Sequence, residues 1–364
     1  MPLSRRRLLQ GMLAYSLLPA LGHATPEQAA PRWLVSPLNI GNLSHNGRLR
    51  WPLEAGQISA KTPLPARGHG AVFTHDGKVL ILARRPGTQA WLLDLTSGEV
   101  CGGFSSDEDH HLFGHAVYSA DQRYLFTSEN HIPTGQGRIV VRDARDFRVL
   151  DSHPSHGIGP HELILLPDRH TLAVANGGIL TLPETGRVKL NVASMVSSLA
   201  YVDSRNGALR GEYRVPLPQL SLRHLARTPD GRLAAAMQFE GQDDRTPLIA
   251  FHQGEDPLSI PQLAEDTQRR MAGYTASIAA LASQPLHAAT HPKGNGVSLW
   301  RNGQWQGWVD IPKASGIADM GDAFLVSNEL GELYRVSPQG EKQLLLREPG
   351  VMWDNHIYLS PPAA

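Results

Sequence analysis

The sequence predicts an all-β protein, a seven-bladed β-propeller that is closed by pairing N-terminal strands with a C-terminal strand. Three observations favour this fold. A unit that contains a histidine repeats: 46 residues separate His69 from His115 and His115 from His161, and 63 separate His161 from His224. Short runs that alternate apolar and polar residues are separated by turns, and Gly (35) and Pro (27) are abundant between them. A period of 40–50 residues with about four strands per unit is typical of propeller blades.

The first residues predict an export signal that precedes this fold. Ser4-Arg5-Arg6-Arg7-Leu8-Leu9 matches the twin-arginine pattern, an apolar stretch 11–21 follows, and Gly22-His23-Ala24 resembles a cleavage site. The stretch is shorter than the ~20 apolar residues that span a bilayer. We therefore expect a signal peptide at 1–24, a propeller at 25–364, no membrane anchor after cleavage, and a periplasmic location.

The strands of six blades can be assigned in order from alternation and turn signals. Blade 3 carries an insertion around 181–193, and a short helix is expected within 262–273 of blade 4. The predicted strands are 70–74, 78–84, 89–96 and 100–104; 115–119, 123–128, 138–143 and 149–153; 161–166, 171–176, 196–203 and 211–215; 223–228, 232–238 and 247–252; 276–283, 286–291, 296–302 and 304–311; 316–321, 323–328, 331–337 and 342–349.

Runs at the two ends of the chain remain unassigned to these six blades. The last apolar run, 353–359, has no partner after it, whereas the N-terminal region offers three runs, 32–37, 47–52 and 56–61. Together these four strands would form a seventh blade and leave no free sheet edge. The alternative is a ring of six blades with the N-terminal strands outside it.

Five histidines occupy the same place in the repeat. The innermost strand of each propeller blade lines the central channel, so equivalent positions converge on one point. Blades 5 and 6 carry Ser277 or Ile278 and Ala318 near this position. The five candidate metal ligands are His69, His115, His161, His224 and His356.

Further candidates lie near the same face. The second strand of each blade returns to this face, which adds His131 and His291 as possible ligands and several amides. Charged residues beside the ring histidines are candidates for orienting the imidazoles. These are Glu162, Arg67, Arg223 and Asp354.

Composition narrows the chemistry of the predicted site. Lys+Arg and Asp+Glu are both 34, which gives no sign of a nucleic-acid partner, and the single cysteine, Cys101, excludes a thiolate-rich site. Neutral imidazole suits iron, copper, zinc or nickel. Imidazoles held close together should have lowered pKa values, which keeps them neutral near pH 7. The opposing interpretation is that these histidines are structural and hydrogen-bond across the blade.

The motifs RGHG, FGHAVYS, GIGPHEL, RHLA and WDNH, together with the twin-arginine leader, resemble a family of bacterial periplasmic propellers of unknown function. These propellers are often encoded beside imelysin-like and dihaem peroxidase-like proteins. The resemblance covers the mature chain. It implies a role in handling periplasmic iron or another metal, and imelysin-like or haem-containing partners. A more distant architectural similarity is to the histidine-ringed copper propeller of nitrous oxide reductase, but this chain lacks that enzyme's cupredoxin domain, so its activity is not carried over.

Three functions remain open from the sequence. The first is a periplasmic propeller that binds iron or copper through the histidine ring, in metal acquisition or handling. The second is a scaffold for periplasmic iron or haem proteins, in which the histidines are structural. The third is a metal-dependent propeller enzyme; no GxSxG, Walker or CxxC motif points to another catalytic class.

Overall fold

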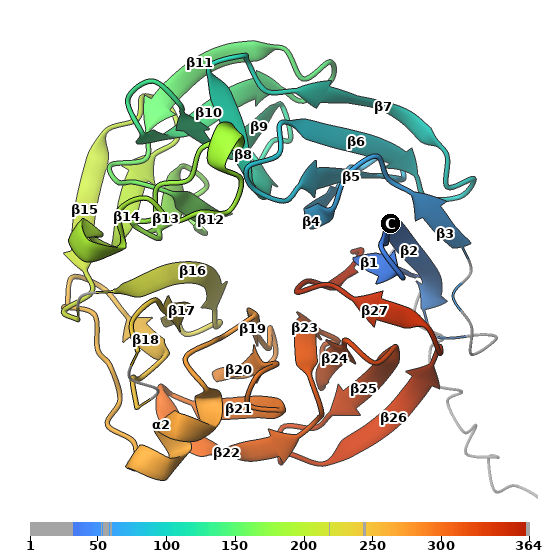
Figure 1. Ribbon diagram of the computed structural model, residues 1–364, viewed down its shortest axis with the longest axis vertical. Helices are drawn as coiled ribbons and strands as arrows, with labels where there is room; N and C mark the ends of the chain where they lie inside the picture. The colour runs from blue at the N-terminus through green and yellow to red at the C-terminus, as the bar shows by residue number, and fades with distance from the viewer. Residues whose placement is uncertain are drawn as a thin grey trace, which may run out of the picture.

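Seven antiparallel sheets form a ring around a central channel (Figure 1). The computed structural model describes residues 32–361 apart from 52, 54–57, 59, 218, 243 and 244. The predicted signal peptide at 1–24 lies outside the described residues. The innermost strands of blades 1 to 6, labelled β4, β8, β12, β16, β19 and β23, surround the channel in Figure 1.

The strands agree with the predicted order, and the blades are numbered as in the sequence. Blade 1 comprises β4 (Gly68–Phe73), β5 (Lys78–Ala83), β6 (Gln89–Asp94) and β7 (Val100–Ser105). Blade 2 comprises β8 (His110–Tyr118), β9 (Tyr124–His131), β10 (Gln136–Asp143) and β11 (Val149–Pro154). Blade 3 comprises β12 (Pro160–Leu165), β13 (Thr171–Asn176), β14 (Ser198–Asp203) and β15 (Leu209–Arg214), with the 3-10 turns η1 (Pro183–Thr185) and η2 (Val192–Ser194) between β13 and β14.

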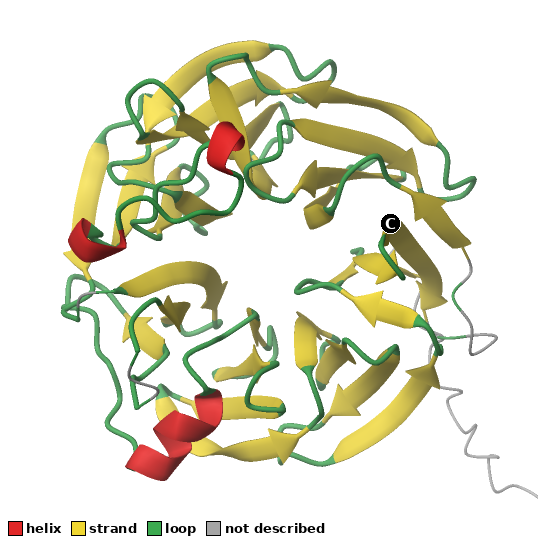
Figure 2. Ribbon diagram, viewed as in Figure 1, coloured by secondary structure: helices red, strands yellow, loops and turns green. Residues whose placement is uncertain are grey.

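The remaining blades complete the ring. Blade 4 has three strands, β16 (Leu220–Arg227), β17 (Leu233–Phe239) and β18 (Ile249–His252), followed by the helix α2 (Glu265–Met271). Blade 5 comprises β19 (Ser277–Ala280), β20 (Leu286–His291), β21 (Gly296–Arg301) and β22 (Gln304–Asp310). Blade 6 comprises β23 (Ala314–Asp319), β24 (Phe324–Asn328), β25 (Glu332–Val336) and β26 (Lys342–Arg347). Figure 2 shows how little helix accompanies these strands.

The seventh blade joins the two ends of the chain, as the sequence predicts. It contains β1 (Arg32–Ile40), β2 (Leu43–Trp51), β3 (Ala60–Pro63), β27 (Val351–Trp353) and β28 (Tyr358–Leu359). Both C-terminal strands pair with β1, at Leu38–Trp353 and at Leu34–Leu359. The six-bladed alternative is therefore wrong. This closure fixes the C-terminal segment that carries the fifth histidine.

Apolar packing between neighbouring blades holds the ring together. The largest cluster of buried apolar side chains runs from β13 and β14 through blade 4 to β20 and β21, and it includes Met237, Phe251 and Trp300. The predicted helix within 262–273 is confirmed as α2, whose Met271 joins this cluster. Among the described residues, no helix has the length and apolar character needed to cross a membrane.

Candidate metal centre

Four of the five ring histidines sit at irregularities in the innermost strand of their blade. The pairing register shifts between Gly68 and Ala71, Leu112 and Ala116, Pro160 and Leu163, and Leu222 and His224. A bulge releases a residue from the hydrogen-bond ladder and redirects its side chain, and bulges are frequent beside functional sites. The shifts in blades 1 to 3 thus leave His69, His115 and His161 outside the ladder. The shift in blade 4 leaves out Arg223, and the next residue, His224, pairs with Ala236.

Blade 6 and the closing segment carry no ring histidine at such a shift within a strand. In blade 6 the shift encloses Ser315 and Gly316, so these residues occupy the position for which the sequence suggested Ala318. The sequence also placed each ring histidine at the start of its strand, whereas His115 is the sixth residue of β8 because Leu112 and its neighbours already pair with β9. His356 lies between β27 and β28.

A glycine beside His115 allows the imidazoles to approach one another. Gly114 has a φ of +99°, which side-chain-bearing residues rarely adopt, and a Cβ there would lie 2.6 Å from Cδ2 of His69. Any other residue at this position would therefore collide with His69. The glycine in FGH is explained by the close contact between two blades.

The structure brings all five ring histidines together. Their imidazole centroids are separated by 4.5 Å between His224 and His356, 4.6 Å between His69 and His356, and 4.8 Å between His69 and His115. His161 lies 4.8 Å from His224 and 5.0 Å from His115. Residues that span 287 positions of the chain thus form one compact imidazole cluster.

Burial keeps this cluster neutral. Each of the five side chains is at most 5% exposed. Burial lowers the pKa of His115 to about 4, against the opposing effect of Glu162, and lowers the pKa of His224 to about 3, with help from the charge of Arg223. Burial and then the neighbouring imidazoles hold the pKa values of His69, His161 and His356 well below the usual range. The direction agrees with the prediction from the sequence.

The cluster has many ring nitrogens without hydrogen-bond partners. Six buried nitrogens have no partner within the described part of the chain: Nδ1 and Nε2 of His69, Nε2 of His115, Nδ1 of His161, Nε2 of His224 and Nε2 of His356. Buried polar atoms are nearly always paired in native proteins, because an unmade hydrogen bond costs ~1–3 kcal/mol. Six such atoms at one point are the donor set that a transition metal uses.

Two overlapping groups of these side chains have the spacing of metal ligands. His69, His115 and His356 form one group, and His115, His161 and His224 form the other, with the ligand atoms of each group within 4.8 Å of one another. Nitrogens bound to one metal at ~2.1 Å lie at most ~4.2 Å apart. Small rotations of the rings would bring either group to that spacing. His115 belongs to both groups.

Glu162, a predicted orienting residue, lies against two histidines of the cluster. Its Oε2 lies 3.2 Å from Nδ1 of His224 and accepts a hydrogen bond from the backbone N–H of Leu225 at 2.9 Å. Its Oε1 lies 3.9 Å from Nδ1 of His115. Burial raises the pKa of Glu162, against the opposing effect of His115. When ionised, the carboxylate only accepts hydrogen bonds, so Nδ1 of His224 would carry the proton and the lone pair would be on Nε2. A carboxylate behind a histidine in this way is usual for metal-bound imidazole.

The other predicted orienting residues contact each other or other carboxylates. Nε of Arg67 donates to Asp354 at 2.5 Å, and Nη2 of Arg223 lies 3.5 Å from Glu240. Neither arginine nor Asp354 hydrogen-bonds a ring imidazole. Arg223 acts on the cluster through its charge alone, which lowers the pKa of His161 and His224.

His131 and His291 lie outside the cluster. His131 lies at the end of β9, where it contacts Asp109 at 3.2 Å and its ring lies 5.1 Å from that of His110. His291 is buried, with Nε2 2.9 Å from Oγ of Ser298 and its ring stacked on Trp308. The strands that carry them do return to this face, but their side chains find partners within their own blades.

Hydroxyl side chains that support the bulges were missed from the sequence. Oγ of Ser128 donates to the backbone oxygens of both His115 and His161, at 3.1 Å each, and Oγ of Ser36 donates to that of His356 at 2.6 Å. Oγ of Ser277 lies 3.2 Å from Nδ1 of His356. A Ser or Thr near the end of the second strand, as in LFTSEN and LVSN, was the available signal.

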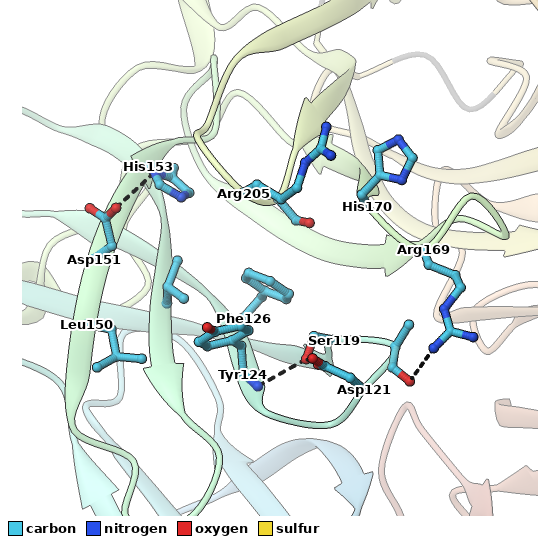
Figure 3. A pocket seen from close by; sticks show the side chains of 13 residues that line it. Ser119, Asp121, Tyr124, Phe126, Leu150, Asp151, His153, Arg169, His170 and Arg205 are labelled. Carbon is cyan, nitrogen blue, oxygen red and sulfur yellow. Dashed lines mark hydrogen bonds and ion pairs between the residues drawn. The ribbon is translucent and has the colours of Figure 1, made fainter.

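A pocket away from the cluster lies on the ring of blades. It has a volume of about 610 Å³ and lies between blades 2 and 3, and Figure 3 shows Tyr124, Phe126 and Arg169 among its lining side chains. A smaller cavity of about 340 Å³ adjoins the cluster and is lined by His356, Glu162 and other residues. Of these two, only the smaller one reaches the imidazoles of the cluster.

Comparison with known proteins places the chain in a family. Residues 62–360 match the family described as "Protein of unknown function (DUF1513)". The chain belongs to this family. No curated protein sequence matches it.

Solved structures with the same fold have other sequences. A streptogramin B lyase superposes with a TM-score of 0.58 at 12% identity, over 87% of this chain and 88% of that chain. A catalytically inactive virginiamycin B lyase from Staphylococcus aureus, solved with quinupristin, gives a TM-score of 0.56 at 12% identity, over 81% and 92%. At this identity the likeness shows the propeller fold alone.

Proposed function

We propose that this member of the DUF1513 family binds a transition metal, iron or copper, at the five-histidine cluster of its central channel. The observation that carries the proposal is the convergence of six unpaired, buried ring nitrogens from five blades. Their low pKa values keep the imidazoles in the neutral form that binds metals. His69, His115, His161, His224 and His356 would hold the metal, and Glu162 would fix the tautomer of His224.

The cellular part of the proposal rests on the sequence. The Ser4–Leu9 pattern favours twin-arginine export to the periplasm, where the protein would take part in metal acquisition or handling. Imelysin-like or haem-containing proteins are the proposed partners.

Elemental mass spectrometry of untagged protein purified from the periplasm tests this proposal. We expect near-stoichiometric iron or copper in the natural protein. A His115→Ala/His224→Ala variant should retain none, with an unchanged circular dichroism spectrum. Metal-free natural protein that also fails to bind added iron, copper or zinc would refute metal binding.

A metal-dependent enzyme is the second candidate, favoured by the cavity beside the cluster. This cavity of about 340 Å³ is lined by His356, Glu162 and Tyr358, so a substrate there would lie next to the proposed metal and a carboxylate. Turnover that disappears on metal removal and returns on its addition would establish this function.

A further inference from the structure

A chamber lined by arginines adjoins the histidine cluster on the channel axis. Besides the imidazoles of His69 and His161, it is lined by four guanidinium groups and three neutral polar side chains. The lining residues are Arg84, Arg85, Arg187, Arg223, Gln238, Tyr274 and Asn355. They come from blades 1, 3, 4 and 7 and from the connection between α2 and β19. The void itself is only about 20 Å³, the space of a water-sized group.

The insertion in blade 3 is anchored so that it contributes Arg187. Nε2 of His111 lies 3.0 Å from the backbone oxygen of Thr181, and Nδ1 lies 3.2 Å from that of Leu112. Further along, Lys189 forms an ion pair with Glu240, which also faces Arg223. The insertion thus reaches from blade 3 towards the channel and is held at both ends.

The positive charge of the chamber exceeds its compensation. Arg84, Arg85 and Arg187 form no ion pair with any described carboxylate. The nearby Arg67 has Asp354, and Arg223 shares Glu240 with Lys189. Two carboxylates therefore face five arginines and a lysine.

Two of these guanidinium groups also have a buried nitrogen without a hydrogen-bond partner among the described residues. Arg85 is 5% exposed, and its Nη1 is buried without a partner among the described residues. Arg223 is 1% exposed, and its Nε is likewise buried without a partner among them. Burial and the neighbouring arginines hold the pKa of Arg85 well below its usual range, and burial lowers the pKa of Arg84 to about 10. Buried charge is tolerated when it is paired, so this cluster requires an anion.

The neutral groups add a donor suited to the same ligand. Nδ2 of Asn355 donates to the hydroxyl oxygen of Tyr274 at 3.1 Å, which leaves the hydroxyl proton of Tyr274 to donate. Planar guanidinium groups match the paired oxygens of carboxylates and phosphates. Of the outer arginines, Arg84 is partly buried and Arg187 is exposed. The rest of an anion can therefore extend past them towards solvent.

We propose that this chamber binds a small oxyanion, a carboxylate or a phosphate, on the channel axis beside the histidine cluster. One oxygen of the anion enters the void between Arg85 and Arg223, and Arg84 and Arg187 contact its outer oxygens. The site does not depend on the metal, because none of the arginines hydrogen-bonds a ring imidazole.

Isothermal titration calorimetry of chelator-treated full-length protein at low ionic strength tests this, with citrate and inorganic phosphate as the two probes. We expect at least one probe to bind the natural protein. Arg84→Gln and Arg187→Gln should each weaken binding ~10-fold or more, since each removes a charge-assisted contact. Arg214→Gln, which removes an exposed arginine from the outer strand β15, is the matched control and should bind as the natural protein does. Citrate binding alone would identify a carboxylate site, and phosphate binding alone a phosphate site.

The metal site and the anion site can fail separately. His115 does not line the chamber, so His115→Ala should keep the anion while losing metal, and Arg84→Gln/Arg187→Gln should keep metal while losing the anion. Both arginines lie outside the buried core, so these variants should fold, which circular dichroism verifies. Failure of both probes to bind at millimolar concentration, or equal affinity in the arginine variants and the natural protein, would overturn the proposal.

Discussion

Two sets of buried histidines in this propeller have opposite surroundings. His291 has partners at both ring nitrogens, Ser298 and the backbone oxygen of Tyr274. His111 lies against the backbone oxygens of Leu112 and Thr181, and its neutral imidazole donates its single N–H proton to one of them. In the five-histidine cluster at least one nitrogen of every ring is unpaired. The paired set is what structural histidines look like in this fold, and the channel cluster does not match it.

One other histidine shows why convergence matters. His287 is also buried without hydrogen-bond partners, but it lies against Phe251 and in none of the groups with metal-ligand spacing. An isolated unpaired imidazole offers a metal one ligand. The channel offers five, and this number separates a candidate centre from a local packing solution.

The largest expected effect comes from His115, which belongs to both groups with ligand spacing. We expect His115→Ala to weaken iron or copper binding by at least ~100-fold, since it removes a direct ligand and outer partners alone contribute 10–100-fold. His161→Ala, which disrupts one group, should weaken binding less. Competition titration with a chelator of known affinity measures both.

His291→Ala is the control for that comparison. Its ring is buried but already hydrogen-bonded, so metal affinity should stay within about twofold of the natural protein. If His291→Ala loses metal as His115→Ala does, the distinction between the two sets of histidines is wrong.

The next effect is that of Glu162. We expect Glu162→Gln to weaken metal binding ~10–100-fold, because a neutral amide no longer holds the proton on Nδ1 of His224 as a carboxylate does. Arg67→Gln is the comparison, since Arg67 pairs with Asp354 and touches no imidazole. Equal affinities in the Glu162→Gln variant and the natural protein would remove Glu162 from the site.

In the metal-free protein, His291 should contribute more to stability than His69. This order is the reverse of their expected contributions to metal binding. We expect His291→Leu to lower the free energy of unfolding by ~1–3 kcal/mol, because it removes the buried hydrogen bond between Nε2 and Oγ of Ser298 and the contact of Nδ1 with the backbone oxygen of Tyr274. His69→Leu should cost less, because neither of its nitrogens has a hydrogen bond to lose. Urea unfolding of chelator-treated protein compares them, and a larger loss for His69→Leu would favour a structural cluster.

The sequence predicted the blades and the convergence because both follow from the repeat. Once His69, His115 and His161 recur every 46 residues, ring symmetry places them on one axis. The closing blade was also predictable, since an unpaired last strand needs partners and three N-terminal runs were free. Those inferences require only periodicity.

Side-chain direction was not predictable in the same way. His131 and His291 sit at strand ends that approach the right face, but local partners, Asp109 and Ser298, hold their rings away from the cluster. The bulges that redirect the ring histidines depend on backbone register, which one extra residue alters without changing the alternation pattern. Arg84, Arg85 and Arg187 gave no periodic signal, because two separate loops, after β5 and after β13, bring them together.

The smallest expected effect is on the pH dependence of stability, and it distinguishes the buried His291 from the exposed His75. Burial lowers the pKa of His291 to about 3 in the folded protein, whereas an unfolded histidine has a pKa near 6.5. Between these values the unfolded chain binds a proton that the folded protein does not, so stability falls as pH falls below 6.5. One such group contributes ~1.4 kcal/mol per pH unit at most.

His291→Gln should therefore flatten the pH dependence of metal-free unfolding by up to one proton between pH 6.5 and 5, whereas His75→Gln, at an exposed turn, should leave it unchanged. Equal slopes for His291→Gln and the natural protein in urea unfolding would show that His291 is protonated, and hence differently paired, in the folded state.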